Sequence, residues 1–195
     1  MPRRDVPLIA GHYYHLYNRG HNRAPIFFDE ENYAFFLRQL RKYVVPTHAC
    51  VIAYVLMPNH YHLLLQAQTD SLSHAMQLFS ISYTKAINKR IQRTGSVFEG
   101  VFQAKRVDRD EYLLHLSRYI HLNPYTSYIV KDIPSLTTYT FSSFLEFQNK
   151  AIKPICNKDI ILTQFSKDTS YNKFVEEYAA YQRTLSQIKH LLLEK

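Results

Sequence analysis

Glycine and cysteine are both scarce in this chain, and each scarcity excludes a class of protein. Only four glycines occur among 195 residues, and the one Gly-x4-Gly spacing, Gly95 to Gly100, is not followed by Lys-Ser/Thr. The chain therefore lacks the loop with which nucleoside triphosphatases hold phosphate, and ATP chemistry is disfavoured. Cys50 and Cys156 lie far apart, with no Cys-x-x-Cys pair. This spacing argues against a disulfide framework, a zinc ribbon and a thioredoxin-like redox site.

Long hydrophobic runs are missing as well. No stretch approaches 18 uninterrupted apolar residues, and residues 1–7 lack the apolar core of a signal peptide. We therefore expect a protein of the reducing cytoplasm that does not enter a membrane. What the chain has instead is positive charge, because 24 Lys and Arg against 16 Asp and Glu give a net charge of +8. This excess favours a polyanionic partner, and nucleic acid is the leading class.

Hydrophobic patterns in the first third of the chain predict two strands around a helix and the start of a hairpin. Residues 12–18 are β-prone and close on a turn, and Asp29 caps a helix that ends before Pro46. The continuous apolar run over residues 50–57 is typical of a central strand covered on both faces. A Pro-Asn turn then leads into a further strand over residues 60–65.

The following segment predicts another helix, strand and helix. A second helix runs until Gly95 stops it, and a fourth strand covers residues 98–107. Asp108 and Glu111 resemble a capping box that opens a third helix, which we expect to end before Pro124. The stripe that the second helix buries consists of Leu72, Met76, Phe79, Tyr83 and Ile87.

The order βαββαβα predicts an α+β protein with a ferredoxin-like antiparallel sheet and helices chiefly on one face. We assign residues 1–145 to this domain and residues 146–195 to a C-terminal helical extension. The last helix is expected to pack back or to dimerise. Its apolar positions alternate in steps of four and three: Phe174, Tyr178, Tyr181, Leu185, Ile188 and Leu192.

Two histidines of the third predicted strand are candidate metal ligands. His60 and His62 are two residues apart, so in a strand both side chains point to the same face and can share one ion. The spacing alone is weak evidence, because two hydrogen-bonded strand histidines would give the same pattern.

The third predicted helix carries polar residues at intervals of four. His115, Tyr119 and Asn123 therefore stack along one face of the helix. Each has an ordinary interpretation. Tyr119 can be a half-buried aromatic residue with a satisfied hydroxyl, and Asn123 can be a residue at the helix end before Pro124.

Both motifs together resemble a known family. Residues 57–65, Met-Pro-Asn-His-Tyr-His-Leu-Leu-Leu, and residues 117–124, Ser-Arg-Tyr-Ile-His-Leu-Asn-Pro, resemble the His-hydrophobic-His single-tyrosine transposases. The resemblance is strongest to the subgroup associated with repetitive extragenic palindromes, and it spans residues 10–145. Two motifs in the correct order are far more specific than either alone. Shorter similarities occur at residues 17–20, 82–85, 88–89, 95–98 and 142–144.

This resemblance implies an activity and a role for each residue of the two motifs. It implies a metal-dependent single-stranded DNA transposase that cleaves and rejoins DNA near hairpins through a 5′-phosphotyrosine. Tyr119 is then the nucleophile, His60 and His62 are metal ligands, and Asn123 is the third ligand. The expected ion is Mg²⁺ or Mn²⁺. His115 is a geometric candidate for a base next to the nucleophile, and we assign it no catalytic role.

A basic track is expected to bind the DNA phosphates, although a solvated basic helix face would show the same pattern. Relatives in the subgroup often carry a basic residue where this chain has Val101. We therefore assign part of the phosphate contact to Lys105 and Arg106 instead. The predicted DNA-binding residues are Lys85, Lys89, Arg90, Arg93, Lys105 and Arg106. The sequence leaves open whether the chain forms a homodimer and whether Tyr119 serves its own metal or a neighbour's.

Two other interpretations remain. The chain can be a non-catalytic protein that binds hairpin DNA or RNA on the same fold, although the intact His60, His62, Tyr119 and Asn123 favour the enzyme. An RNA-binding module that stacks bases on strand aromatics is the other, but the aromatic-rich glycine motif of those modules is missing. The aromatic residues that would stack bases are Tyr13, Tyr17, Tyr61 and Phe102.

Overall fold

The computed structural model describes residues 6–151, 153–165 and 170–193, with side chains up to residue 185. The predictions made for residues 1–5 and for the side chains of Ile188 and Leu192 lie outside this part. Within it, no helix is both long and apolar enough to span a bilayer.

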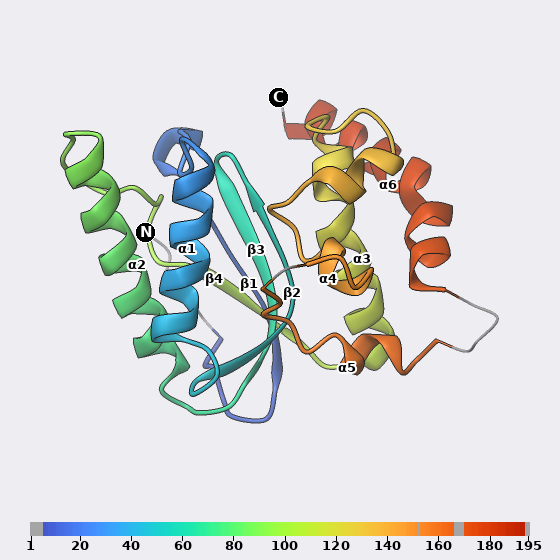
Figure 1. Cartoon of the computed structure of the whole chain (residues 1–195), viewed down its shortest axis with the longest axis horizontal. Helices are drawn as coiled ribbons and strands as arrows, with labels where there is room; N and C mark the ends of the chain where they lie inside the picture. The colour runs from blue at the N-terminus through green and yellow to red at the C-terminus, as the bar shows by residue number, and fades with distance from the viewer. Residues whose placement is uncertain (1–5, 152, 166–169, 194–195) are drawn as a thin grey trace.

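A single four-stranded sheet organises the molecule (Figure 1). The strand order is β2-β3-β1-β4, and every pair is antiparallel. Strand β1 therefore lies between β3 and β4, which is the ferredoxin-like arrangement predicted from the element order. The strands are β1 (Tyr13–Arg19), β2 (Ala49–Met57), β3 (His60–Ala67) and β4 (Gln103–Val107).

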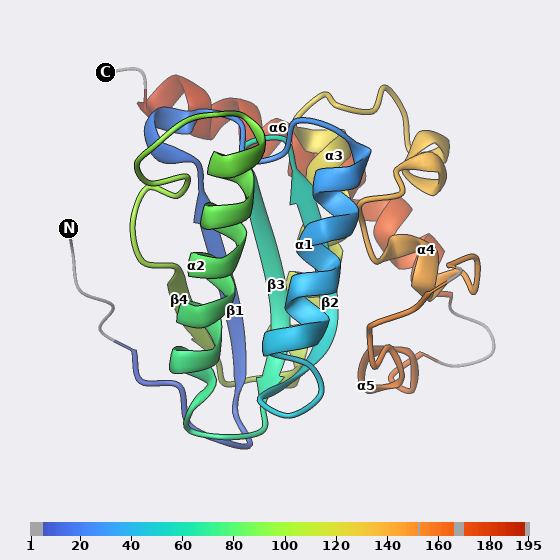
Figure 2. The ribbon, with the colours of Figure 1, turned by 60° about the vertical axis from the view of Figure 1, so that its left-hand side comes forward.

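Two helices, α1 (Glu30–Tyr43) and α2 (Leu72–Arg90), pack side by side on one face of the sheet (Figure 2). The predicted cap is confirmed, because the Asp29 side chain accepts a hydrogen bond from the Asn32 backbone N–H at 3.0 Å. The first hydrophobic core fills the space between this helix pair and the sheet. Its fully buried side chains include Tyr14, Leu16, Phe36, Tyr61, Leu63, Phe79 and Tyr83.

The opposite face of the sheet is also covered, so the expectation of helices chiefly on one face is wrong. The helix α3 (Asp110–Thr126) packs across β2 and β3 (Figure 1). Strand β2 explains this arrangement, because it is apolar on both faces and needs a second layer. Its side chains Ile52 and Val55 belong to the second core, and Val51 and Leu56 belong to the first.

The C-terminal extension folds back onto α3 of the same chain. Its longest helix, α6 (Tyr171–Leu193), lies along α3, where the Arg118 guanidinium is held between the Phe174 and Tyr178 rings, 4.1 and 3.7 Å from their centres. Residues from both sides of position 145 thus share the second core. The shorter elements are η1 (His21–Arg23), η2 (Pro134–Thr138), α4 (Phe144–Phe147) and α5 (Asp159–Leu162).

The start of α3 differs from the sequence prediction. The residue that precedes the helix is Arg109, and the capping box of Asp108 and Glu111 is not formed. Asp108 instead pairs with Arg106 of β4, with 2.6 Å between Oδ1 and Nε. The Asp108 carboxylate is therefore bound to a cation of the preceding strand and does not cap the helix.

The end of α3 also differs, because the helix continues through Pro124 to Thr126. A proline in this position has no N–H to donate to the carbonyl of Ile120, which is why an earlier end is expected. The chain nevertheless stays helical, since the Ser127 N–H donates to the carbonyl of Asn123 at 2.9 Å. Asn123 therefore lies within the helix rather than at its end.

Helix α2 ends earlier than expected, at Arg90 rather than at Gly95. Gln92 adopts a left-handed conformation with φ of 52°, and the Arg93 N–H reaches back to the carbonyl of Asn88 at 3.0 Å. This hydrogen bond is characteristic of a Schellman motif. Here Gln92, rather than glycine, occupies the left-handed position of the motif. Arg93 is consequently not on the helix. Strand β4 likewise begins at Gln103, later than the predicted residue 98.

Candidate active site

The two histidines of β3 lie on the face of the sheet that α3 covers. Strand alternation sends Tyr61 and Leu63 into the first core and turns His60 and His62 to the opposite face. The centres of the two imidazole rings are 5.2 Å apart, and the rings stand at 81° to each other. This spacing lets nitrogen atoms of both rings converge on one ion.

Helix α3 brings Tyr119 to the same place. The Tyr119 ring stands edge-on to the His62 ring, with 5.8 Å between the two centres. Since these residues are 57 positions apart in the sequence, only the packing of α3 on the sheet joins them. The phenol and the imidazole pair, which the sequence left on separate elements, are therefore neighbours.

One helical turn further on, Asn123 links the tyrosine to the other histidine. Its side-chain amide donates to the Tyr119 carbonyl at 2.9 Å and forms a hydrogen bond with the His60 side chain. Burial raises the pKa of Tyr119, and a hydrogen bond from the Asn123 side chain partly offsets that shift. The tyrosine is therefore a neutral phenol at physiological pH.

The histidines of this site are neutral. Burial lowers the pKa of His60 to about 4, and the hydrogen bond with Asn123 opposes the shift. Burial lowers the pKa of His62 well below its usual value, and the nearby His15 and His60 lower it further. A neutral imidazole keeps the lone pair that a metal ion needs. The donor set of two neutral imidazoles and one carboxamide fits a divalent cation.

A further histidine, His15 of β1, belongs to this cluster, and the sequence reasoning missed it. His15 is 7% exposed, and its Nε2 lies 2.9 Å from Nδ1 of His62. Burial lowers its pKa to about 4, assisted by the charge of Lys105. Alternation along β1 places His15 and Tyr17 on one face, and the β1–β3 register, which pairs Tyr17 with His62, brings that face to the site.

Tyr17 is the second aromatic residue that the fold adds to the site. Its ring centre lies 5.0 Å from that of His15 and 5.9 Å from that of His62. The sequence placed Tyr17 in a family motif and among residues that can stack bases, but it did not place this phenol beside the paired histidines.

A cleft of about 1170 Å³ opens beside the histidines. Its lining combines β1 and β3 residues with the loop after β1 and the segment that follows α3. Tyr119 is half-buried and is not among the lining residues, but its ring lies against that of His62, which lines the cleft. The polar and charged lining residues include Tyr17, Arg19, His21, Arg23, Asn59, His60, His62, Glu99 and Gln103.

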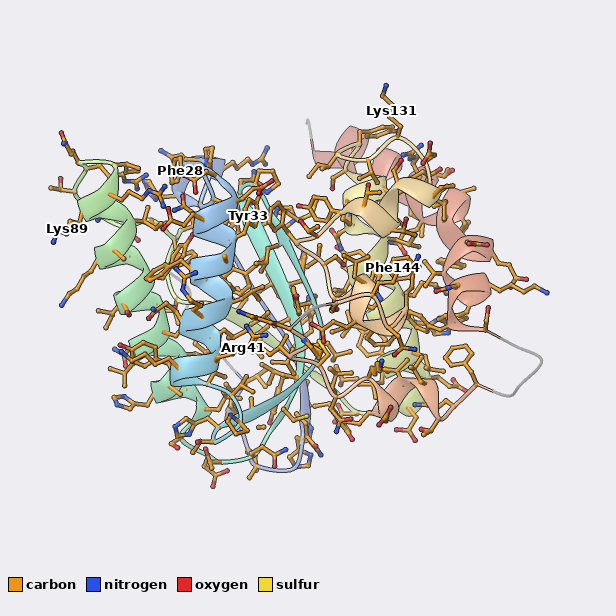
Figure 3. All side chains as sticks on the ribbon, viewed as in Figure 1. Phe28, Tyr33, Arg41, Lys89, Lys131 and Phe144 are labelled. Atoms are coloured by element: carbon orange, nitrogen blue, oxygen red, sulfur yellow. The ribbon has the colours of Figure 1, made fainter. Side chains whose placement is uncertain are left out.

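None of the six predicted DNA-binding residues is among the residues that line this cleft. Lys85, Lys89 and Arg90 lie on α2, across the sheet from α3, and Lys89 points outward at the far edge of the molecule (Figure 3). Arg90 is paired with Asp29 and Glu31.

Of the other three predicted cations, Lys105 and Arg106 lie on β4, and Arg93 lies in the segment that follows α2. Lys105 pairs with His15 in the β1–β4 register and so lies nearest to the histidines. Arg106 is bound to Asp108. The Arg93 guanidinium donates to the carbonyl of Ser96 at 2.8 Å.

The structure directs His115 away from the tyrosine. Its side chain is exposed, and Nδ1 lies 2.8 Å from a guanidinium nitrogen of Arg118. Its ring also lies against Phe174 of α6, with 5.9 Å between the ring centres. These contacts belong to the α3–α6 interface rather than to the histidine cluster.

Comparison with known proteins identifies the class to which this fold and site belong. Residues 9–123 match a family described as "Transposase IS200 like", and the match runs from the residues before β1 to Asn123. Because it covers more than half of the chain, the protein belongs to the IS200-like transposase family. No curated protein matches the sequence significantly.

A solved structure shares the fold. The chain is similar to a REP-associated tyrosine transposase bound to a REP hairpin, with 18% sequence identity and a TM-score of 0.65. The similar region covers 80% of this chain and 90% of the other. At this identity the comparison establishes the common architecture alone.

Proposed function

We propose that this transposase is a metal-dependent enzyme that cleaves and rejoins single-stranded DNA near hairpins, with Tyr119 as nucleophile. The observation that carries the proposal is the meeting of Tyr119 with the β3 histidines, 5.8 Å between the ring centres of Tyr119 and His62. Tyr119 and the two histidines come from separate elements, and a sheet face that served only packing would not need this polar cluster.

His60, His62 and Asn123 are the residues that would hold a divalent ion, Mg²⁺ or Mn²⁺. When bound there, the ion supplies electrostatic stabilisation for the charge that develops on the phosphate during attack. The residues' own contributions are to stay neutral and to keep their orientation. Burial achieves the first for both histidines, and Asn123 is held by its hydrogen bond to the Tyr119 carbonyl.

Tyr119 attacks through its phenolic oxygen. A new bond forms between this oxygen and phosphorus, and the bond from phosphorus to the 3′ oxygen of the preceding nucleotide breaks. The phenol proton leaves to solvent, and the released 3′ oxygen takes up a proton to become a hydroxyl. The product is a 5′-phosphotyrosine, and a second 3′-hydroxyl can reverse the step to join strands. Bond energy is conserved, so no nucleotide cofactor is needed.

The cleft suggests where the strand lies. Arg19 and Arg23 line it together with His60 and His62. Arg19 is paired with Glu99, so Arg23 is the proposed contact for a phosphate of the strand. Tyr17 offers a ring on which a base can stack. A hairpin next to the single strand is supported by the REP hairpin in the similar solved structure. Tyr119 meets His62 of its own chain, and we therefore propose that a homodimer is not required for a complete site.

The proposal is tested by incubating the protein with Mn²⁺ and end-labelled single strands that carry a hairpin, followed by denaturing electrophoresis. Wild type is expected to form a covalent protein–DNA adduct, and Tyr119→Phe is expected to form none. Tyr17→Phe is the matched control, because it removes a second phenol beside the same histidine and should keep the adduct. An adduct that persists in Tyr119→Phe would contradict the assignment. Hairpin binding by wild type without any adduct would favour a non-catalytic binding protein.

A further inference from the structure

His15 makes a contact that neither the family motifs nor the proposed chemistry explains. Its ring is almost fully buried, at 7% exposure, and its Nε2 lies 2.9 Å from Nδ1 of His62. The two rings are tilted by 31°, with 5.0 Å between their centres. The backbone of β1 fixes this approach, since β1 pairs with β3 along its whole length.

A hydrogen bond between two neutral imidazoles requires one nitrogen to donate and the other to accept. If Nδ1 of His62 donates to His15, then Nε2 of His62 keeps its lone pair and is free to bind a metal ion. In the opposite arrangement, Nε2 of His62 carries the proton and cannot bind. The direction of this one hydrogen bond therefore decides whether His62 can act as a ligand.

The contacts of the neighbouring His60 indicate its tautomer and give a precedent for the direction at His62. Nδ1 of His60 lies 2.7 Å from Oδ1 of Asn59. The Asn59 amide is oriented by its other end, because Nδ2 donates to the carbonyl of Arg23 at 3.1 Å. A carbonyl oxygen only accepts, so Nδ1 of His60 is the donor and Nε2 carries the lone pair. If His15 is the acceptor, His60 and His62 both keep the lone pair of Nε2 for a metal ion.

We propose that His15 is a positioning residue that accepts the Nδ1 proton of His62 and thereby keeps Nε2 of His62 free for the metal ion. This inference rests on the proposed function, in which His62 is a ligand. Partners of this kind orient metal-binding histidines and fix their tautomer in many proteins. The buried position of His15 favours the contact, because an Nδ1–H of His62 that points to this position and finds no acceptor is left without a hydrogen bond.

Two variants separate the hydrogen bond from ring packing. His15→Phe keeps a ring beside Tyr17 and His62 but removes the acceptor, whereas His15→Gln replaces Nε2 with an amide oxygen that can accept. His12→Phe is a control that alters a histidine directly before β1, where it contacts Arg106. Thermal unfolding of each variant checks that the fold is kept.

The first measurement is Mn²⁺ binding to the full chain without DNA. Binding is detected as a decrease in the electron paramagnetic resonance signal of free Mn²⁺. We expect His15→Phe to bind about 10–100-fold more weakly than wild type, and His15→Gln and His12→Phe to bind nearly as well. A folded His15→Phe with wild-type affinity would overturn the inference. If wild type and His62→Ala bind Mn²⁺ equally well, the proposed metal site itself is wrong and the inference falls with it.

The second measurement reads the tautomer of His62 directly, in long-range proton–nitrogen correlation spectra of the metal-free wild-type chain. The proposal predicts a proton on Nδ1 of His62 in wild type and in His15→Gln, and a shift toward the Nε2–H form in His15→Phe. A wild-type His62 with its proton on Nε2 would overturn the role of His15 while leaving Tyr119 and the cleavage reaction untouched.

Discussion

Gln182 of α6 donates a hydrogen bond from its side-chain amide to the backbone carbonyl of Tyr119, at 3.2 Å. Gln182 is 5% exposed. The same carbonyl accepts the amide of Asn123 at 2.9 Å, so two side chains hold the backbone at the proposed nucleophile. One of them comes from a helix that lies outside the family match. The C-terminal extension therefore fixes the position of Tyr119 in addition to covering α3.

We expect Gln182→Leu to slow adduct formation. Loss of a buried hydrogen bond costs about 0.5–1.5 kcal/mol of stability, and a small displacement of a reacting group lowers rates by up to about 10²-fold. The measurement is the single-turnover rate of adduct formation at a temperature where the variant is folded. Thr184→Ala, an exposed neighbour on α6, should behave like wild type. Equal rates for the two variants would show that α6 does not position the tyrosine.

The cations of the cleft and those of α2 are expected to differ in DNA binding. Arg23→Ala should weaken binding to a single strand and reduce the slope of log affinity against log salt by about 0.7, the value for one lost phosphate contact. Lys89→Ala should change neither, because Lys89 lies across the sheet from the cleft. Fluorescence anisotropy at several salt concentrations checks both. A larger loss for Lys89→Ala would restore the basic face of α2 as the DNA track.

Tyr17 is expected to support a base through its ring rather than through its hydroxyl. Tyr17→Ala should weaken single-strand binding by about 1–3 kcal/mol, the range for loss of one aromatic stacking contact, while Tyr17→Phe should bind like wild type. Equilibrium binding of short strands to the metal-free protein measures this without cleavage. Comparable losses for Tyr17→Ala and Tyr17→Phe would assign the contribution to the hydroxyl instead.

The buried histidines predict a loss of stability in mild acid. Burial lowers the pKa of His15 and His60 to about 4 and that of His121 to about 3. In the unfolded chain each returns to about 6.5, so the unfolded state binds more protons as the pH falls. Stability from these residues is therefore complete above about pH 6.5 and is lost progressively toward pH 4.

Denaturant unfolding between about pH 7.5 and about pH 4 measures this effect. His15→Phe should flatten the pH dependence, because it removes one of the buried titrating groups. His74→Ala, which removes an exposed histidine of α2, should leave the dependence unchanged. A wild-type stability that stays constant over this range would contradict the burial of neutral imidazoles.

The sequence was sufficient to predict the fold class and to select four of the residues that meet in the site. His60 and His62 were assigned to one strand face from alternation, and His115, Tyr119 and Asn123 to one helix face from a spacing of four. Both patterns are local, and they hold for all but His115, which contacts Arg118 and Phe174 instead. That the two faces meet was implied by family resemblance, and the structure now shows the proximity itself.

What the sequence could not supply depends on contacts between distant segments. His15 stood as a single histidine in an aromatic strand, and only the pairing of β1 with β3 brings it to His62. The continuation of α3 beyond Pro124 coincides with a contact from α6, where Arg183 donates to the carbonyl of Tyr125 at 2.8 Å. The spacing of Lys85 and Lys89 predicted that they share one helix face. It could not predict on which side of the sheet that helix packs.

The most direct test of the central claim is the identity of the residue that carries the DNA. The adduct formed with Mn²⁺ and a hairpin-bearing strand is digested with protease and nuclease, and the modified peptide is sequenced by mass spectrometry. The account predicts a nucleotide linked through its 5′ phosphate to Tyr119. A nucleotide found on Tyr17, or on any residue other than Tyr119, would contradict it.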